Sequence, residues 1–443
     1  MNRLIYLDNA ATTRISAAAL AAMRAVYEGD AFANPSSQHA AGDLALRTLE
    51  DARARVAACL HARPSEVEFC SGGSEANSQA LLTGAAEGAR SGRRHIVASA
   101  IEHPSVLRTL EWLASPEGPY GGGFEVTLVR PCADGIVSVA AVKEALREDT
   151  CLVSVMYANN ETGAIQPVRD LCRACRKRGI LFHTDAVQAA GHLPIDVTRD
   201  GFDLLTVSAH KFHGPRGVGA LVCSHRLVPV PLVRGGAQER GHRAGTVNVA
   251  GAAGMAAALE EAVQAMGDRT RQTAGLRARL ERALATLPGT HVLGPSDPAL
   301  RLPGILSVAL EGAGREAALV LLDERGICAS AGSACAAGAS EESHVLAAMG
   351  VAPELAGTAL RFSLDAAEND EADVDRAARS VADVVSQLRA RSGWRPTAPD
   401  GTYGVRGETG PSPARSDDGT GASPASMGTA DSEGTPSQPG ASR

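Results

Sequence analysis

The stretch CLVSVMYANNETGAIQPVRDLCRACRKRGILFHTDAVQAAG, residues 151–191, decides the fold class. It opens with the apolar run CLVSVMYA (151–158) and continues through a helical pattern over 167–179 to a second apolar run, ILFHT (180–184). Runs that are apolar throughout are typical of strands covered on both faces. A helix between two such strands is the usual parallel crossover. The sequence therefore predicts an α/β protein with a mostly parallel sheet.

The same alternation extends in both directions from this stretch. Further strand candidates are RHIVASA (94–100), EVTLV (125–129), DLLTVS (203–208) and VGALVC (218–223), with a helical pattern at 136–148. A long helical stretch then interrupts the rhythm at 251–287. It is followed by GILSVAL (304–310), a helix near 314–326 and another from about 370 to 391. We read these as a second, smaller α/β domain.

We expect a domain plan with four parts. The predicted parts are an N-terminal segment 1–15 that packs with the small domain, a large domain 16–255, a small C-terminal domain 256–393, and a tail 396–443. Gly, Pro, Ser, Thr and Ala dominate the tail, which therefore lacks the apolar surface needed to offset the entropy of ordering. We expect it to be disordered.

Composition narrows the class of function. The chain has 443 residues, 44% of them hydrophobic, and a net charge of -7 with scattered basic residues. That balance argues against nucleic acid or an anionic membrane as the main partner. The N-terminus lacks the apolar run of a signal peptide, and no segment has the roughly 18 apolar residues of a membrane span. We expect a cytoplasmic protein.

The nine cysteines indicate reduced thiols, because their number is odd and no export signal precedes them. Cys172 and Cys175 form a CxxC on a predicted helix. No second pair follows, so core packing is the favoured reading over metal or redox chemistry. Cys328 lies at a predicted strand and is read as a small core thiol in the same way.

Polar residues follow three of the predicted strands, where ligands bind in open α/β sheets. An Asp after a strand is more often a helix cap, and any one of these residues alone would be unremarkable. Their convergence favours a functional site. The residues are Asn160, Asp185, Gln188, Ser208, His210 and Lys211.

A fourth element carries Ser71-Gly72-Gly73-Ser74 from a short apolar run into a helix. Backbone N–H groups at a helix N-terminus bind anions, phosphate above all. The alternative is an ordinary helix cap made by Ser74. The segment lacks both the dinucleotide fingerprint and the lysine of a P-loop, so it suggests a single phosphate.

A phosphate site, a carboxylate, a lysine and a histidine together indicate pyridoxal 5'-phosphate. In such sites a lysine forms an aldimine with the cofactor and a carboxylate pairs with the pyridinium nitrogen. Lys211 and Asp185 fit these two roles, and His103 after another strand is placed to stack on the ring.

With these residues in view, the chain resembles the pyridoxal-phosphate-dependent cysteine desulfurases of the NifS/IscS type, in the class V aminotransferase family. The likeness covers about residues 4–390. It is carried by YLDNAATT (6–13), NPSSQH (34–39), SGGSEAN (71–77), EHPSVL (102–107), NNETGAIQP (159–167), HTDAVQAAG (183–191), SAHKFHGPRGVGAL (208–221), GGAQERGHRAGT (235–246), SAGSACAAG (330–338) and RFSL (361–364). The resemblance implies fold-type I, with a mostly parallel seven-stranded sheet in a large cofactor-binding domain and a smaller α/β domain that holds a catalytic cysteine loop.

For the cofactor, the resemblance implies that Lys211 holds it as an aldimine and moves the substrate's Cα proton. Asp185 would pair with the pyridine nitrogen, Gln188 would bond the ring hydroxyl, and His103 would stack on the ring and take part in catalysis. The phosphate ligands would be Gly73, Ser74, Ser208 and His210, and Thr246 would reach the cofactor phosphate of a partner subunit in a homodimer.

For the substrate, the resemblance implies that Asn160 and Arg361 hold the carboxylate of L-cysteine. Cys335 would take the sulfur as a persulfide, pass it to an acceptor protein such as a scaffold or thiolation enzyme, and transiently ligate an iron–sulfur cluster. The residues around it, ASAGSACAAGAS, are too small to pack a core, which fits a mobile carrier loop.

The sequence departs from the family at two places, and other functions stay open. Gly73-Ser74 stands where Ala-Thr is usual, and Ala237 stands where a third glycine is common. Ser still offers a hydroxyl; no functional consequence is drawn for Ala237. The alternatives are a selenocysteine lyase or a cystine C–S lyase, and a non-catalytic scaffold that keeps the fold. Cys335 separates the first two from a desulfurase, and the intact Lys211, Asp185 and His103 argue against the scaffold.

Overall fold

The computed structural model describes residues 4–332 and 342–395. Its strands are β1 (Ile5–Tyr6), β2 (Val67–Cys70), β3 (His95–Ser99), β4 (Glu125–Val129), β5 (Thr150–Ser154), β6 (Leu181–Asp185), β7 (Leu204–Ser208), β8 (Gly219–Cys223), β9 (Thr290–Leu293), β10 (Ile305–Leu310), β11 (Ile327–Cys328) and β12 (Ala359–Ser363). Its α-helices are α1 (Ala17–Glu28), α2 (Ala40–Cys59), α3 (Gly73–Arg90), α4 (Pro104–Ala114), α5 (Val139–Ala145), α6 (Val168–Arg176), α7 (Val197–Asp200), α8 (Val249–Ala285), α9 (Arg315–Glu324), α10 (His344–Ala348), α11 (Pro353–Ala356) and α12 (Glu371–Ser392).

Seven strands form the main sheet, in the order β2-β8-β7-β6-β5-β3-β4. The pairs from β7 through β6, β5 and β3 to β4 are all parallel. Strand β8 runs antiparallel to both of its neighbours, β7 and β2. The predicted mostly parallel seven-stranded sheet is confirmed. The four-residue strand β2 escaped prediction as a strand, because it reads only as a short apolar run before the glycines.

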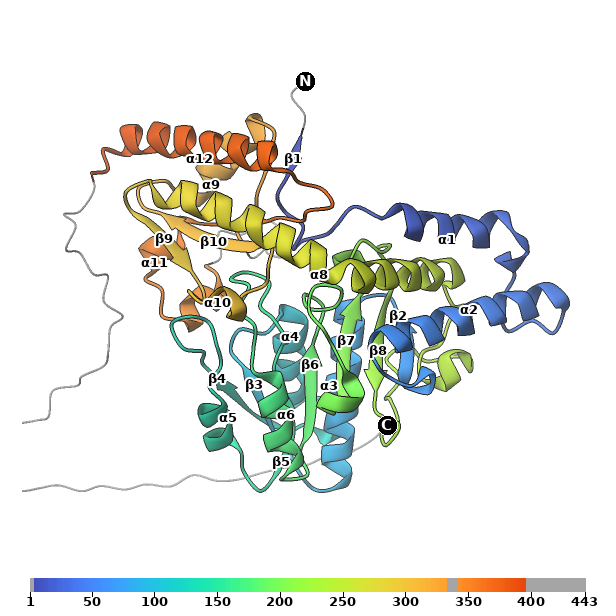
Figure 1. Cartoon of the computed structure of the whole chain (residues 1–443). Coiled ribbons are helices and arrows are strands. Elements are labelled where there is room, and N and C mark those ends of the chain that lie inside the picture. Colours follow the sequence, from blue (N-terminus) through green and yellow to red (C-terminus); the bar gives the residue numbers. More distant parts are fainter. Residues whose placement is uncertain (1–3, 333–341, 396–443) are drawn as a thin grey trace, which may run out of the picture. The chain divides into compact units, whose positions relative to one another are not determined.

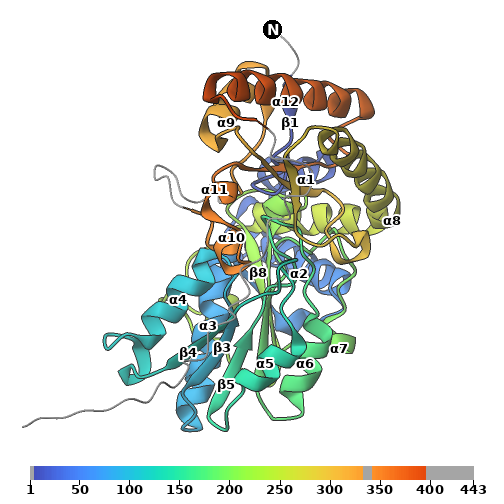
Figure 2. The ribbon, with the colours of Figure 1, turned by 90° about the vertical axis from the view of Figure 1, so that its left-hand side faces the viewer.

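Helices cover both faces of this sheet, as the apolar strands require. Figure 2 shows α3 and α4 on one side and α5, α6 and α7 on the other. Alternate residues of one strand point to opposite sides. Ile96 and Ala98 of β3 pack in the core cluster that contains α3 and α4, whereas Val97 packs in the one that contains Leu171 of α6.

The later elements form a second, smaller group. Strands β12, β10 and β9 make an antiparallel sheet, and β1 pairs in parallel with β11. Their apolar faces share a core with α8, α9 and α12, the helices at the upper end of Figure 1. The helix α8 begins at Val249 and runs unbroken past residue 255, so the predicted boundaries at 15, 255 and 393 stay predictions. The tail predicted to be disordered lies outside the described residues.

Cys172 and Cys175 are core residues, as predicted. Both face inward from α6, and the Cys172 thiol donates to the carbonyl oxygen of Gly201. Burial raises the pKa of both thiols to about 12, so they stay protonated. Cys328 lies on β11, as predicted, and is only half-buried.

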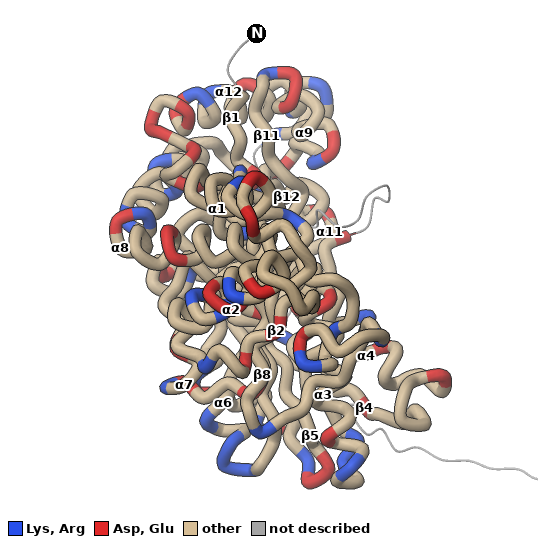
Figure 3. Tube along the Cα trace, turned by 90° about the vertical axis from the view of Figure 1, so that its right-hand side faces the viewer, with Lys and Arg blue, Asp and Glu red and all other residues tan. Residues whose placement is uncertain are grey.

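No helix within 4–332 and 342–395 is long and apolar enough to cross a membrane. Figure 3 shows Lys and Arg interspersed with Asp and Glu along the chain. This agrees with the scattered basic residues seen in the sequence.

Candidate active site

The ends of parallel strands bring the predicted site residues to one edge of the main sheet. Strand β6 ends at Asp185 and β7 ends at Ser208. His103 follows the end of β3 by four residues, and Asn160 follows the end of β5 by six. Because these four strands are mutually parallel, their carboxyl ends lie at the same edge. This part of the sequence prediction is confirmed as a placement.

Lys211 ends a 3₁₀ turn, Ala209–Lys211, that starts directly after β7. Its Nζ donates to the carbonyl oxygens of Ala10 at 2.6 Å and Ala11 at 2.9 Å. The side chain of Gln188 donates to the same Ala10 oxygen at 2.9 Å. The lysine amine and the glutamine side chain therefore both donate to the N-terminal segment, which the sequence predicted only to pack with the small domain.

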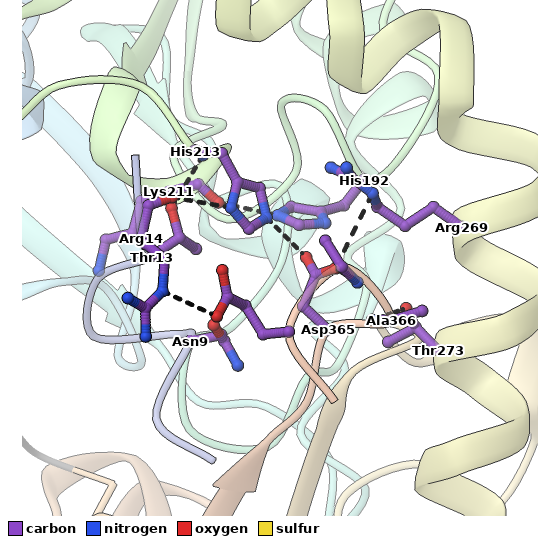
Figure 4. A network of polar contacts seen from close by, with 12 residues as sticks. Asn9, Thr13, Arg14, His192, Lys211, His213, Arg269, Thr273, Asp365 and Ala366 are labelled. Carbon is purple, nitrogen blue, oxygen red and sulfur yellow. Dashed lines mark hydrogen bonds and ion pairs between the residues drawn. The ribbon is translucent and has the colours of Figure 1, made fainter. Parts of the chain in front are cut away.

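The turn that carries Lys211 is fixed from three directions (Figure 4). The backbone N–H of Thr13 donates to the carbonyl oxygen of His210 at 2.9 Å. The ring of His192 lies 3.0 Å from the carbonyl oxygen of Lys211. His213, at a φ of 66° that ordinary residues rarely adopt, contacts Asp365. These contacts hold the backbone of Lys211 in place.

His213 and Asp365 form a buried ion pair that sequence analysis missed. The ring of His213 places Nδ1 2.9 Å from the carbonyl oxygen of Arg14 and Nε2 3.0 Å from Asp365 Oδ2. The carbonyl oxygen of Arg14 and the carboxylate of Asp365 are both hydrogen-bond acceptors. Burial alone raises the pKa of Asp365, but the hydrogen bond and charge of His213 outweigh it and hold that pKa at about 2. The pair ties the lysine turn to the segment just after β12.

Replacing Asp365 with asparagine is expected to lower the free energy of unfolding by roughly 2–3 kcal/mol at neutral pH. The carboxyl's pKa is about 2 in the folded protein and about 3.9 when unfolded. Its contribution is therefore present above about pH 4 and is lost as the pH falls toward 2. Urea unfolding of both proteins between about pH 7 and 3 should show the difference narrowing as the acid limit is approached.

Asp170→Asn is the matched control, because Asp170 is exposed and, within the described part of the chain, pairs only with Arg173 one turn away. It should shift stability by less than about 0.5 kcal/mol at every pH. A difference between wild type and Asp365→Asn that stays constant down to about pH 3 would show that His213 does not hold the carboxylate ionised.

Asp185 is buried and accepts two hydrogen bonds. Its Oδ2 accepts from Asn77 Nδ2 at 2.7 Å and its Oδ1 from the backbone N–H of Val187 at 2.9 Å. Asn77 lies on α3 and also donates to Ser105 Oγ at 3.0 Å, and that oxygen lies 2.8 Å from His103 Nδ1. The two predicted ring-binding residues, Asp185 and His103, are thus joined through two residues that sequence analysis passed over.

Glu102, next to His103, is a fully buried acid without a predicted role. Burial raises its pKa to about 8, and the negative charge of Asp185 adds to that rise. Ser99 and the backbone N–H of Met156 donate to its Oε1 and oppose the rise. At neutral pH the carboxyl therefore keeps its proton, so Asp185 has no second negative charge beside it.

The start of α3 has a glycine cap that no side chain bonds. The residue that caps this 18-residue helix is Gly72, at a φ of 155°, and no side chain bonds to the cap. A Cβ on Gly73 would lie 2.8 Å from Val187 Cγ2, so only glycine fits without a shift. Ser74 is already inside the helix, so the alternative reading of an ordinary cap made by Ser74 is wrong.

The remaining predicted phosphate ligands are Ser208, His210 and Thr246. A Cβ on Gly72 would lie 3.7 Å from Ser208 Oγ, which puts that hydroxyl beside the glycines. His210 contacts Thr12 Oγ1 at 3.1 Å, and burial together with Lys211 and Arg216 lowers its pKa to about 4, so its ring is neutral. Thr246 is exposed and lines a cavity of about 50 Å³ with Ser71, away from Lys211's contacts.

Arg361 and Asn160, the predicted carboxylate ligands, are in contact. Arg361 donates through Nη1 to the carbonyl oxygens of Asn160 and Gly332, both at 2.9 Å. Its Nη2 lies 2.6 Å from Asp8 Oδ1. Asp8 is the only carboxylate that pairs with Arg361 among the described residues, and it was not predicted. A substrate carboxylate would meet a guanidinium whose orientation is already set.

Cys335, the predicted nucleophile, lies outside the described residues, and so does the carrier loop predicted around it. The residues on either side are described and converge on Glu161. The Ser343 hydroxyl donates to Glu161 Oε2 at 2.5 Å, and a Cβ on Gly332 would lie 3.0 Å from the same oxygen. Burial raises the pKa of Glu161. Gly332 and Ser343 therefore both lie beside Glu161, the neighbour of Asn160 in the chain.

The model of the aminotransferase class-V family matches residues 5–377. The chain belongs to the class-V aminotransferase family. It is 41% identical over 395 residues to the cysteine desulfurase IscS of Methanosarcina thermophila, covering 89% of this chain and 95% of that protein. At that identity and coverage the chain is also a member of the cysteine desulfurases, and the resemblance seen in the sequence is confirmed.

Two solved structures agree with this assignment. A NifS-like protein superposes with a TM-score of 0.80 at 36% identity, covering 87% of this chain and 100% of that one. A protein solved as SspA in complex with cysteine gives a TM-score of 0.70 at 33% identity, covering 81% and 98%. The fold prediction is confirmed by these neighbours, and the family is one of enzymes that depend on pyridoxal phosphate.

Proposed function

We propose that this protein converts L-cysteine to L-alanine with pyridoxal 5'-phosphate and transfers the sulfur to Cys335 as a persulfide. One observation carries the proposal. Lys211, Asp185, His103 and the open start of α3 gather at one edge of the sheet, with Arg361 joined to Asn160, which follows another strand of that edge. That set supplies a covalent anchor, a ring partner, an anion site and a carboxylate ligand in one place.

The residues fit the proposed cofactor. The cap-free glycine start of α3 and the adjacent Ser208 hydroxyl suit a phosphate, with Gly73, Ser74 and His210 as further ligands. Asp185, oriented by Asn77 and Val187, suits a protonated ring nitrogen, and Gln188 suits the ring hydroxyl. When bound, the cofactor withdraws electrons from the substrate's Cα and so weakens the bonds around it.

Substrate binding is assigned to Arg361 and Asn160. The planar guanidinium can bind both carboxylate oxygens of L-cysteine. Asp8 and the two backbone carbonyls hold that fork in one plane, which reduces the ordering cost of binding. The amine of Lys211 is positioned by hydrogen bonds to the carbonyl oxygens of Ala10 and Ala11. It then accepts the Cα proton of the substrate and returns it.

The sulfur step needs no outside oxidant. The thiolate of Cys335 attacks the sulfur of the bound cysteine, so an S–S bond forms as the C–S bond breaks. The bonding pair stays on the β-carbon, which takes up a proton and becomes the methyl group of alanine. Cys335 keeps the sulfur as a persulfide until an acceptor protein, such as a scaffold or a thiolation enzyme, removes it. An iron–sulfur cluster bound at Cys335 would be a transient ligand and not a permanent part of the protein.

A homodimer is also part of the proposal. Thr246 is exposed, and within its own chain it lines a cavity together with Ser71. Large apolar side chains are exposed on α1, on the turn that follows it and on α2, among them Tyr27 at 66% and Phe32 at 70%. Exposed apolar residues gathered on neighbouring elements often mark subunit contacts. A second copy on this face would let Thr246 act across the interface.

The proposal is tested by supplying purified protein with pyridoxal phosphate, L-cysteine and dithiothreitol. Alanine and sulfide should appear in equal amounts, because each turnover yields one of each. Sulfide accompanied by pyruvate and ammonia would identify a C–S lyase instead. A much higher kcat/KM with selenocysteine than with cysteine would favour a selenocysteine lyase.

A further inference from the structure

His103 has one ring nitrogen whose protonation state can be read from its neighbours. The residue caps α4, and the backbone N–H of Ser105 donates to Nδ1 at 3.1 Å. A backbone N–H can only donate, so Nδ1 carries no proton. The neutral ring must therefore carry its single proton on Nε2.

The hydroxyl of Ser105 supports the same state. Asn77 Nδ2 has two hydrogens; one bonds Asp185 Oδ2 at 2.7 Å and the other bonds Ser105 Oγ at 3.0 Å. His103 Nδ1 lies 2.8 Å from the same hydroxyl, and because the backbone N–H of Ser105 already requires an unprotonated Nδ1, the hydroxyl donates its hydrogen to that nitrogen. A carboxylate only accepts, so turning the amide of Asn77 over would set its oxygen against Asp185. The donor and the acceptor of each hydrogen bond that links Asp185, Asn77, Ser105 and His103 are therefore fixed.

The surroundings oppose a positive charge on His103. Burial lowers its pKa; the charge of Asp185 opposes this shift, and the charges of Lys211 and His344 add to it. The amino end of α4 carries a partial positive charge that acts the same way. A proton on Nδ1 would also displace both donors of Ser105. Geometry and electrostatics favour one neutral tautomer.

We propose that Ser105 and Asn77 are positioning residues that hold His103 as the neutral tautomer with its proton on Nε2. They join that ring to Asp185, so the acid and the stacking histidine are oriented by one hydrogen-bonded chain. The catalytic meaning rests on the proposed function: a fixed Nε2–H donor beside the reacting atoms is a proton source whose position does not vary. The tautomer itself does not depend on which reaction is catalysed.

The direct test is ¹⁵N NMR of the histidine rings, with His103 assigned by its absence in His103→Gln. Wild type should show an unprotonated Nδ1 and a protonated Nε2 between about pH 6 and 8. In Ser105→Ala the hydroxyl donor is gone and only the backbone donor remains. In this variant, part of the His103 population should carry its proton on Nδ1, or the ring should begin to gain a second proton between about pH 6 and 8.

Steady-state kinetics provide the second test of the proposal. Ser105→Ala should lower kcat about 5- to 20-fold, as expected for one lost hydrogen bond to a reacting group, and leave KM for cysteine within about twofold. Ser105→Thr keeps the hydroxyl and should restore both the NMR pattern and kcat. Ser78→Ala is the matched control, because it removes a similar hydroxyl contact between α3 and α4, to Thr109 at 3.1 Å, without touching His103.

Two results would overturn the proposal. The first is a wild-type His103 with its proton on Nδ1. The second is a Ser105→Ala ring pattern identical to that of wild type. Should the protein turn out not to be a desulfurase, the NMR result would still decide the tautomer, so the two failures can be told apart.

Discussion

Lys211→Ala is expected to abolish turnover, with kcat lowered by about 10³-fold or more. The amine is both the proposed anchor of the cofactor and the proposed base for the Cα proton, so one change removes two functions. The visible absorption of the purified protein loaded with pyridoxal phosphate should shift away from that of the lysine-bound form. Spectra and steady-state alanine formation measure the two effects separately.

The chain offers a clean control for this change, because it has three lysines, at positions 143, 177 and 211. Lys177→Ala alters an exposed residue just after α6 and should leave spectrum and rate unchanged. Retention of the wild-type spectrum by Lys211→Ala, with normal alanine formation, would mean that the lysine after β7 does not hold the cofactor.

Cys335→Ala is the second change with a very large expected effect. Without the thiol, sulfide release from cysteine in dithiothreitol should fall about 10³-fold or more. The cofactor spectrum should remain normal, because none of the proposed cofactor ligands is altered. Sulfide release and the visible spectrum, measured on the same sample, separate a lost sulfur acceptor from a lost cofactor.

Cys132→Ala is the matched control for an accessible thiol, since Cys132 is exposed in the described part of the chain. It should behave as wild type. Full sulfide release by Cys335→Ala would reject the persulfide route and favour a lyase that expels sulfide directly.

The main sheet was predictable because most of its strands can be recognised from their own residues alone. Runs such as 151–158 and 203–208 are apolar throughout, and such runs have few alternatives to a strand covered on both faces. The polar residues that end β6 and β7 were found by the same logic, since parallel strands deliver their carboxyl ends to one edge. The glycines before α3 were also visible, although Ser74 could not be told from a cap until the helix start was known.

The supporting residues were not predictable, because their partners are far away in the sequence. Asn77 bonds Asp185 across 108 positions, His213 bonds Asp365 across 152, and Asp8 pairs with Arg361 across 353. No local spacing marks such pairs. Motif reading named the residues that are proposed to touch a ligand, but it missed the residues that orient them.

The central claim is that sulfur leaves cysteine by way of Cys335, and mass spectrometry tests it most directly. The holoenzyme is incubated with L-cysteine without reductant, alkylated and digested, and the products are measured alongside alanine. The account predicts one added sulfur atom on the Cys335 peptide, formed in step with alanine. Alanine formed with no added sulfur on that peptide, or with the sulfur on another cysteine, would contradict it.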